Sequence, residues 1–426
     1  MFKKVFLYFI SLVLFFPQLC SAQYEVPLYT SYTTNEARVK LYDRLVKNTI
    51  TKNLSIPITD STEENWQNAF TAMEVLDFKT PFTLAKLHTA FHGIETRSAY
   101  FQKALMEVIY CLYPKSFSSH VTGLLNNSVD PKVFAMCTEY LMRHDTTDHL
   151  KVEIEKKLLD KFRDSISVYP VLSRLQTRLQ PSKLNSAYSI KRVLDGILKR
   201  DFLPNQIVMY SFQRKNRDFP GRIIIRNAAG TFVTDSAGKI FSIPQLARSV
   251  SNLPSYLTNG NTPTGIFRMY GFGVSMSNFI GPTANVQMGM PVELRLQNFF
   301  DNSAISDSVW TIDWYQKLIP ADLKAYVPLY NSYYAGLAGR SEIIAHGTTI
   351  DPKWYHNKPY YPLTPTQGCL CTKEIWDGKR VESDQQKLVN GLLKAGGAKG
   401  YCVVLEIDDK QAPVLLKDIL PYLPTL

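Results

Sequence analysis

Two short segments of this chain combine residues that can perform nucleophilic catalysis. His346-Gly347 is followed, further along, by Thr366-Gln367-Gly368-Cys369. A free cysteine carries little thiolate near neutral pH, so it needs a base close by to become a useful nucleophile. A histidine brought next to it can accept the thiol proton and later return it to a leaving group. The glycine before Cys369 permits a tight turn whose backbone N–H groups can face a developing oxyanion.

A third segment, residues 261–267, precedes these two and reads Asn-Thr-Pro-Thr-Gly-Ile-Phe. The order Thr-Pro-Thr-Gly-x-Phe, then Ile-Ala-His-Gly at 344–347, then Thr-x-Gly-Cys resembles the L,D-transpeptidase (YkuD) catalytic domain over roughly residues 205–408. Where that family usually has Arg or Asn two residues after the cysteine, this chain has Cys371. The resemblance implies a β-rich fold and acyl transfer through a cysteine thioester.

The resemblance implies roles for individual residues. Cys369 would be the nucleophile and His346 the general base, with the backbone carbonyl of Gly347 orienting the imidazole. The backbone N–H groups of Gly368 and Cys369 would be the oxyanion donors. Cys371 would be a packing residue or, alternatively, a resolving partner for an oxidised Cys369. The substrate groove would be shaped or lined by Thr366, Thr264, Gly265 and Tyr361, the last from an aromatic stretch that would otherwise only pack over the sheet.

By the same resemblance, the cysteine would attack a tetrapeptide stem of peptidoglycan, release D-alanine and pass the acyl group to an amine of a second stem. Water in place of the amine would give an L,D-carboxypeptidase, or an amidase that severs cross-links or detaches lipoproteins. The alternative from another class is a non-catalytic cell-wall scaffold. The sequence has no metal-ligand set, phosphate loop or dinucleotide fingerprint, so we expect catalysis without a metal or cofactor.

The first residues are typical of an exported protein. Lys3 and Lys4 precede an apolar run over residues 5–16, and Cys20-Ser21-Ala22 supplies small residues before Gln23. This pattern predicts a signal peptide over residues 1–22 and a periplasmic or secreted protein. The run is too short for a membrane span, which needs about 20 residues, so we expect no permanent span.

The formal net charge of +11 has two equally good interpretations: the protein binds an acidic polymer, or its surface is simply solvated. Basic residues are not clustered with aromatic ones, and this argues against nucleic acid. Three of the cysteines, Cys111, Cys137 and Cys402, lie in apolar patterns and are expected to be buried.

Hydrophobic periodicity divides the chain into an α+β arrangement of two domains. Residues 23–200 read as all-α, with helices expected over 65–75, 83–91, 98–112, 117–125, 131–142 and 150–162. They would form HEAT-like repeats or a compact bundle, which could serve as a scaffold or dock a protein partner. Residues 204–410 read as the β-rich catalytic domain, with strands expected over 206–212, 222–226, 231–234, 239–243, 265–273, 287–296, 342–345 and 401–407 and a helix over 383–395. Residues 411–426 would be a C-terminal helix.

Overall fold

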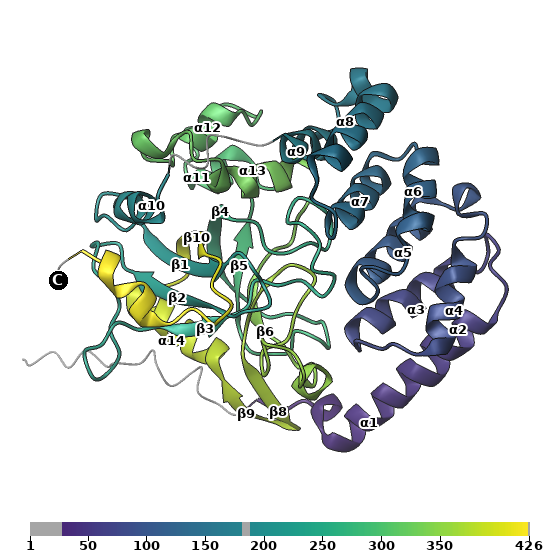
Figure 1. Cartoon of the computed structure of the whole chain (residues 1–426). Coiled ribbons are helices and arrows are strands. Elements are labelled where there is room, and N and C mark those ends of the chain that lie inside the picture. Colours follow the sequence, from purple (N-terminus) through teal and green to yellow (C-terminus); the bar gives the residue numbers. More distant parts are fainter. Residues whose placement is uncertain (1–27, 181–187, 425–426) are drawn as a thin grey trace, which may run out of the picture.

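The computed structural model describes residues 28–180 and 188–424 of the chain, so the predicted signal peptide lies outside the described residues. The fold is mixed α/β, as predicted, with an N-terminal helical region followed by a large β-sheet. In Figure 1 the helices form an arc along one side of the sheet.

The helical region begins with a helix that the sequence analysis missed. Helix α1 (Asn35–Arg44) continues into a π-helical segment (Leu45–Lys52) and the short α2 (Asn53–Ser55). Because α1 buries no residue completely, its apolar positions carry little helical periodicity. The remaining helices are α3 (Glu63–Val75), α4 (Pro81–Ala90), α5 (Ala99–Leu112), α6 (Ser118–Asn127), α7 (Pro131–Met142), α8 (Asp148–Phe162) and α9 (Pro170–Leu179).

These helices pack in two layers. α3, α5, α7 and α9 contact one another in succession, while α4, α6 and α8 each pair with the following member of that row. Figure 1 shows α3, α5 and α7 on the side nearer the sheet and α4 and α6 outside them. Helix α7 begins where its sequence predicts. Asp130 caps it by accepting hydrogen bonds from the amides of Lys132 and Val133, and Pro131 lies in its first turn. The arrangement is that of stacked helical hairpins.

The sheet has eight strands in the order β3-β2-β1-β10-β4-β5-β6-β7. Pairs β1–β10 and β6–β7 are parallel, and the other pairs are antiparallel. The strands are β1 (Ile207–Arg214), β2 (Gly221–Arg226), β3 (Ile243–Gln245), β4 (Gly265–Gly273), β5 (Asn285–Gly289), β6 (Ala345–Gly347), β7 (Leu370–Thr372) and β10 (Lys399–Asp408), while β8 (Glu374–Asp377) and β9 (Lys379–Ser383) form a separate hairpin.

Helices cover both faces of the sheet, so this region is less dominated by strands than the sequence predicts. One face packs against α10 (Ile190–Ile197), α11 (Leu296–Phe300), α12 (Ile312–Gln316) and α13 (Asn331–Leu337), and the other against α14 (Asp384–Ala395). All eight residues of β1 are buried, as expected for a strand with both faces covered.

Several expectations about local structure are wrong. Of the strands expected over 239–243 and 342–345, only Ile243 and Ala345 lie in strands, β3 and β6. The strand expected over 287–296 ends at Gly289, because Pro291 cannot donate to a ladder and α11 begins soon after. Residues 231–234 make only isolated bridges, to Arg226 and Ile240. The C-terminal helix expected within 411–426 is instead two short 3₁₀ turns, Leu416–Asp418 and Leu420–Tyr422, since Pro421 lacks the N–H that a continuing helix needs.

Helix α10 was predicted to belong to the helical domain, but it packs against the sheet. Val193, Leu194 and Ile197 are buried in the same cluster as the central strands β1 and β10. The core of the helical region runs only to Leu179 and also takes in side chains from the loop before β4, among them Tyr256. A helix expected in the first domain therefore belongs to the core of the sheet region, and a loop of the sheet region contributes to the core of the helical region.

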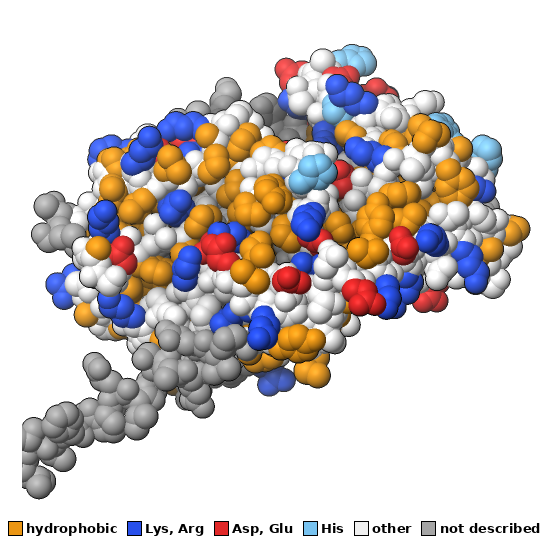
Figure 2. All heavy atoms as spheres, turned by 90° about the horizontal axis from the view of Figure 1, so that it is seen from below, with side chains coloured by type: hydrophobic (Ala, Val, Ile, Leu, Met, Phe, Trp, Pro, Cys, Tyr) orange, Lys and Arg blue, Asp and Glu red, His pale blue; other side chains and the backbone are white. Residues whose placement is uncertain are grey.

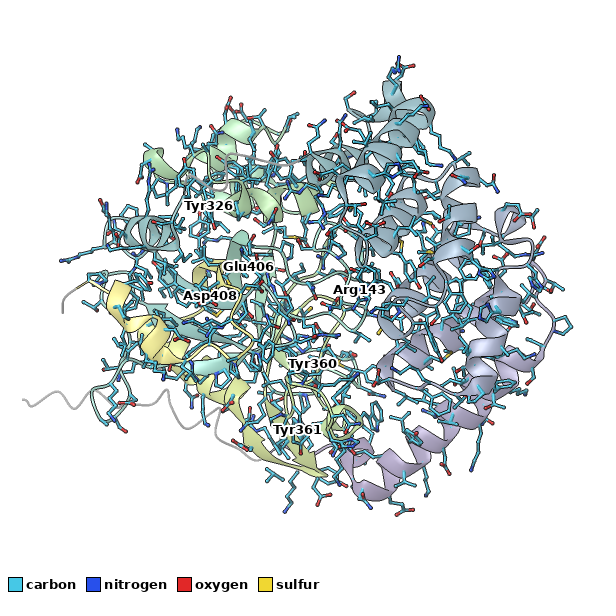
Figure 3. The ribbon with its side chains drawn as sticks, in the orientation of Figure 1. Arg143, Tyr326, Tyr360, Tyr361, Glu406 and Asp408 are labelled. Carbon is cyan, nitrogen blue, oxygen red and sulfur yellow. The ribbon has the colours of Figure 1, made fainter. Side chains whose placement is uncertain are left out.

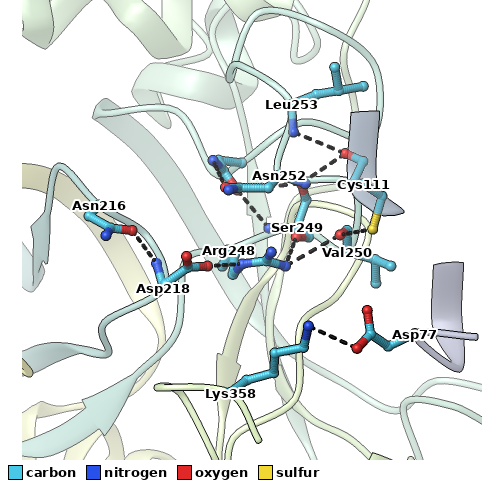
Figure 4. A network of polar contacts seen from close by, with 12 residues as sticks. Asp77, Cys111, Asn216, Asp218, Arg248, Ser249, Val250, Asn252, Leu253 and Lys358 are labelled. Carbon is cyan, nitrogen blue, oxygen red and sulfur yellow. Dashed lines mark hydrogen bonds and ion pairs between the residues drawn. The ribbon is translucent and has the colours of Figure 1, made fainter. Parts of the chain in front are cut away.

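Polar contacts also tie the two regions together (Figure 4). Lys358 pairs with Asp77 at 2.8 Å, and the thiol of Cys111 donates to the carbonyl of Val250 at 3.1 Å. Arg248 bridges that carbonyl and Asp218, on the sheet side. Cys111 is thus only partly buried and lies at the junction, whereas Cys137 and Cys402 are buried as expected.

On the face seen in Figure 2, basic side chains are scattered among acidic and apolar ones and form no broad cationic area. Over residues 28–180 and 188–424, no helix has the length and apolar character required to cross a bilayer.

The junction contains a buried pair of carboxyl groups, Glu74 on α3 and Glu107 on α5. Burial raises the pKa of Glu107 to about 7, against the opposing effect of a hydrogen bond from Asn259. Burial and the charge of Glu107 also raise the pKa of Glu74. Because the unfolded chain releases the Glu107 proton at lower pH, the folded state binds more protons between about pH 4.5 and 7, and stability falls as the pH rises through this range.

We therefore expect Glu107→Gln to stabilise the protein at pH 8 by an amount of the order of 1 kcal/mol and to have little effect at pH 4. Urea unfolding at pH 4, 6 and 8 measures this, with exposed Glu64→Gln as the matched control. A Glu107→Gln effect that is independent of pH would contradict the expectation.

Candidate active site

Cys369 lies at the end of a tight turn that leads into β7. The hydroxyl of Thr366 accepts from the amide of Gly368 at 3.1 Å and donates to the carbonyl of Cys369 at 2.8 Å. The hydroxyl of Thr262 donates to the carbonyl of Gly368 at 2.8 Å. Thr366 thus closes the turn, and Thr262 holds it against the segment before β4.

Gly368 is required in this turn for two reasons. Its φ of +118° lies in the region that other residues rarely adopt. A Cβ there would lie 2.3 Å from Nη2 of Arg340 and 2.7 Å from the carbonyl oxygen of Gly260. The guanidinium of Arg340 is buried and donates to the backbone carbonyls of Ser255, Gly260 and Asn261. The glycine predicted from the motif therefore makes room for a buried cation.

His346 is the middle residue of β6, which pairs in parallel with β7. Its Nδ1 lies 2.8 Å from the carbonyl oxygen of Gly347. Since a carbonyl only accepts, Nδ1 carries the proton and Nε2 keeps its lone pair. A Cβ at position 347 would lie 2.3 Å from Oε2 of Glu374, so glycine is required there too. The contact expected between His346 and Gly347 is present.

His346 and Cys369 line the same cavity, of about 630 Å³. The helical region forms one wall, with Arg44, Asn48, Thr49, Asn53, Asn68 and Thr71 among its lining residues. The sheet region forms the other, with Val250, Phe279, Ile280, Ile350, Pro365 and Gln367. The candidate pair thus opens into a cleft between the two regions, and each side of the cleft carries both polar and apolar side chains.

Both members of the pair are electrically neutral at pH 7. Burial lowers the pKa of His346 to about 4, although the hydrogen bond to Gly347 raises it slightly. Burial raises the pKa of the Cys369 thiol to about 11, against smaller lowering effects from a backbone hydrogen bond at Ile344 and the charge of Arg340. The site therefore holds a thiol and a neutral imidazole.

Only one of the two expected oxyanion donors is free. The amide of Gly368 already donates to Thr366. The amide of Cys369 has no acceptor within the part of the chain that the structure describes. It is the donor best placed to stabilise negative charge next to the sulfur.

The other expected groove residues do not line this cavity, apart from Thr366. Gly265 begins β4 and packs under Ser332 and Tyr315. Thr264 borders a different cavity, on the far side of the segment before β4. Tyr361 is exposed at the boundary of the two regions, beside the buried Tyr360 (Figure 3).

Cys371 is a packing residue in this structure. It is 1% exposed, lies in a small apolar cluster with Leu246 and Tyr360, and does not line the cavity. Burial raises the pKa of its thiol to about 12. The aromatic stretch that follows His346 also packs: Tyr355 donates to the carbonyl of Val75 at 2.6 Å.

Four residues near Cys369 were not predicted from the sequence to belong to the site: Arg340, Asn48, Asn53 and Asn68. Arg340 has no local motif, and only the turn at Gly368 brings it near the cysteine. The asparagines come from three different segments, and their amides make no hydrogen bonds with other described residues. From the sequence alone, a polar residue on a helix is expected to face solvent, unless the region that packs opposite it is known.

Comparison of the chain with protein-family models, curated proteins and solved structures finds no match. A function for this chain can therefore be proposed only from its sequence motifs and from the geometry of the site.

The neutral resting pair predicts how Cys369 reacts with iodoacetamide, which needs the thiolate. Its alkylation rate should rise about tenfold per pH unit between pH 6 and 9, because the thiolate fraction does so well below the pKa. Peptide mass spectrometry over time measures the rate at each cysteine, with Cys369→Ser as the control. A rate that is already constant below pH 8 would indicate a preformed thiolate–imidazolium pair instead.

Proposed function

We propose that this protein is an exported cysteine acyltransferase of the L,D-transpeptidase type, acting on peptidoglycan stem peptides. The observation that carries the proposal is that His346, with a free Nε2, and Cys369, at a constrained turn, open into one cavity. The motif order around them supports the family, and the pattern of residues 1–22 supports a periplasmic or secreted location.

The proton can be followed through the proposed reaction. Nε2 of His346 takes the thiol proton as the sulfur of Cys369 attacks the stem amide, and the amide of Cys369 stabilises the oxyanion. The C–N bond breaks as Nε2 returns the proton to the departing amine of D-alanine, leaving a thioester. An amine from a second stem then loses its proton to Nε2 and attacks the thioester, and the thiol recovers the proton. Water in the amine's place gives the hydrolytic alternative.

The cavity wall formed by helices changes the role proposed for the helical region. Instead of a separate scaffold or docking module, it would bind the substrate over Cys369. The amides of Asn48, Asn53 and Asn68 can both donate and accept hydrogen bonds, as the backbone of an extended peptide requires. The apolar side chains of Phe279, Ile280 and Ile350 on the opposite side would help to exclude water from the thioester. Both features favour an enzyme over a non-catalytic scaffold.

The first test concerns the nucleophile. Cys369→Ser and His346→Ala should each lose several orders of magnitude of turnover of tetrapeptide-containing muropeptides. Cys369→Ser should also form no covalent adduct with a carbapenem, a class that acylates active cysteines of the resembled family. Intact-protein mass spectrometry and muropeptide chromatography measure the two effects, and cross-linked against shortened products distinguish transfer from hydrolysis.

Cys371→Ala is the matched control, because this thiol is buried outside the cavity. It should keep most of the activity and lose only a little stability. If Cys371→Ala were inactive while Cys369→Ser still formed the adduct, the nucleophile would be wrongly assigned.

The second test concerns the helical wall. The double variant Asn48→Ala/Asn68→Ala should lower kcat/KM for muropeptides about tenfold, since each lost hydrogen bond costs about 1 kcal/mol or less. Alkylation of Cys369 by iodoacetamide should be unchanged, because the small reagent does not use the wall. Asn127→Ala, at an exposed position away from the cavity, is the control. Unchanged kcat/KM in the double variant would remove the helical region from substrate binding.

A further inference from the structure

A second cavity, of about 260 Å³, lies where α9, the loop after β1, the segment before β4 and the start of α13 meet. It shares no lining residue with the cavity around Cys369. Four basic residues line it: Arg174, Arg178, Lys215 and Arg217. The other lining residues are mostly polar and uncharged, and Glu406, on β10 (Figure 3), is the acidic one.

The charges in this cavity are not balanced by the protein. Arg178 is fully paired, through two hydrogen bonds to Glu139 at 2.5 and 3.0 Å. Arg217 pairs with Glu406 at 2.7 Å. Arg174 makes hydrogen bonds only to the neutral Asn331, and Lys215 has no side-chain partner among the described residues. Within the described residues, neither the partly buried Arg174, which also lies over the ring of Tyr334, nor the exposed Lys215 is paired with a carboxylate.

The guanidinium of Arg217, which also lines this cavity, is not fully satisfied by the protein. This residue is only 5% exposed, yet its Nε and Nη1 have no hydrogen-bond partner in the described structure. Buried guanidinium groups normally have all their donors paired, because an unpaired buried donor costs free energy. Glu406 satisfies Nη2 alone. An anion seated among these residues would compensate the remaining charge.

The arrangement of Arg174 and Arg178 also favours an anion. They are one helical turn apart on α9, so their like charges face the same cavity. Burial and the charge of Arg178 lower the pKa of Arg174. A bound anion would relieve that repulsion, and a guanidinium fork matches the oxygens of a phosphate group.

We propose that this cavity is a binding site for a phosphate group, held by Arg174, Lys215 and Arg217. The two unbalanced charges match the dianion of phosphate or of a phosphomonoester near neutral pH. The volume is smaller than that of typical drug-sized pockets, about 300 Å³ and above, so it admits a compact group rather than a whole nucleotide or glycan. The site is separate from the function proposed for Cys369.

Calorimetric titration of the whole mature protein with inorganic phosphate, at ionic strength fixed with sodium chloride, tests the proposal. We expect saturable one-to-one binding that weakens at least tenfold in Lys215→Gln and in Arg174→Gln. Lys215 is exposed, so its variant should fold normally even if Arg174→Gln does not. The matched controls are Lys239→Gln and Arg163→Gln, exposed residues outside the cavity, which should bind as the unchanged protein does.

A second titration, with glycerol 3-phosphate, asks whether the phosphate group can be carried on a larger molecule. It should bind and be displaced by inorganic phosphate, because both would use the same guanidinium and ammonium groups. The proposal is overturned if inorganic phosphate gives no saturable heat, or if Lys215→Gln and Lys239→Gln bind it equally well.

Discussion

The buried guanidinium of Arg340 is the constraint on which the arrangement around Cys369 depends. A charge removed from water needs acceptors on every side. Three backbone carbonyls in the segment 255–261 supply them, so that segment must fold back over the guanidinium. The remaining space at position 368 then admits only glycine. The requirement to satisfy one cation thus fixes the turn that presents the cysteine.

The same segment connects this turn to the helices. Together with Leu253 just before it, it places Tyr256 and Leu257 in the core of the helical region, and Asn259 donates to the partly buried carboxyl of Glu107. The helices therefore cannot shift without disturbing the loop that holds the cysteine turn. This coupling explains why a region that the sequence predicts as a separate domain instead forms a wall of the cleft.

The sequence predicts best what depends on local chemistry. Helix α7 has the bounds expected from its proline, its capping aspartate and its apolar spacing, and β4 has those expected from its strand pattern. The turn at Gly368 and the contact between His346 and Gly347 also follow from neighbouring residues. Features that need distant partners were missed: α1, which buries no residue completely, Arg340, and the position of Thr264 at a different cavity. The residue pattern within one segment does not indicate which other part of the chain will pack against it.

The electrostatics of the site constrain the proposed acyl transfer. A thiol with a pKa near 11 and an imidazole with a pKa near 4 store no reactive ion pair. Such a thiol also resists oxidation, which attacks the thiolate. In the proposed reaction, reactivity would have to arise from orientation, with the imidazole held by the hydrogen bond from Nδ1 to the carbonyl of Gly347. Glu374 fills the space where a side chain at position 347 would lie, so only glycine can supply the carbonyl at this point of β6.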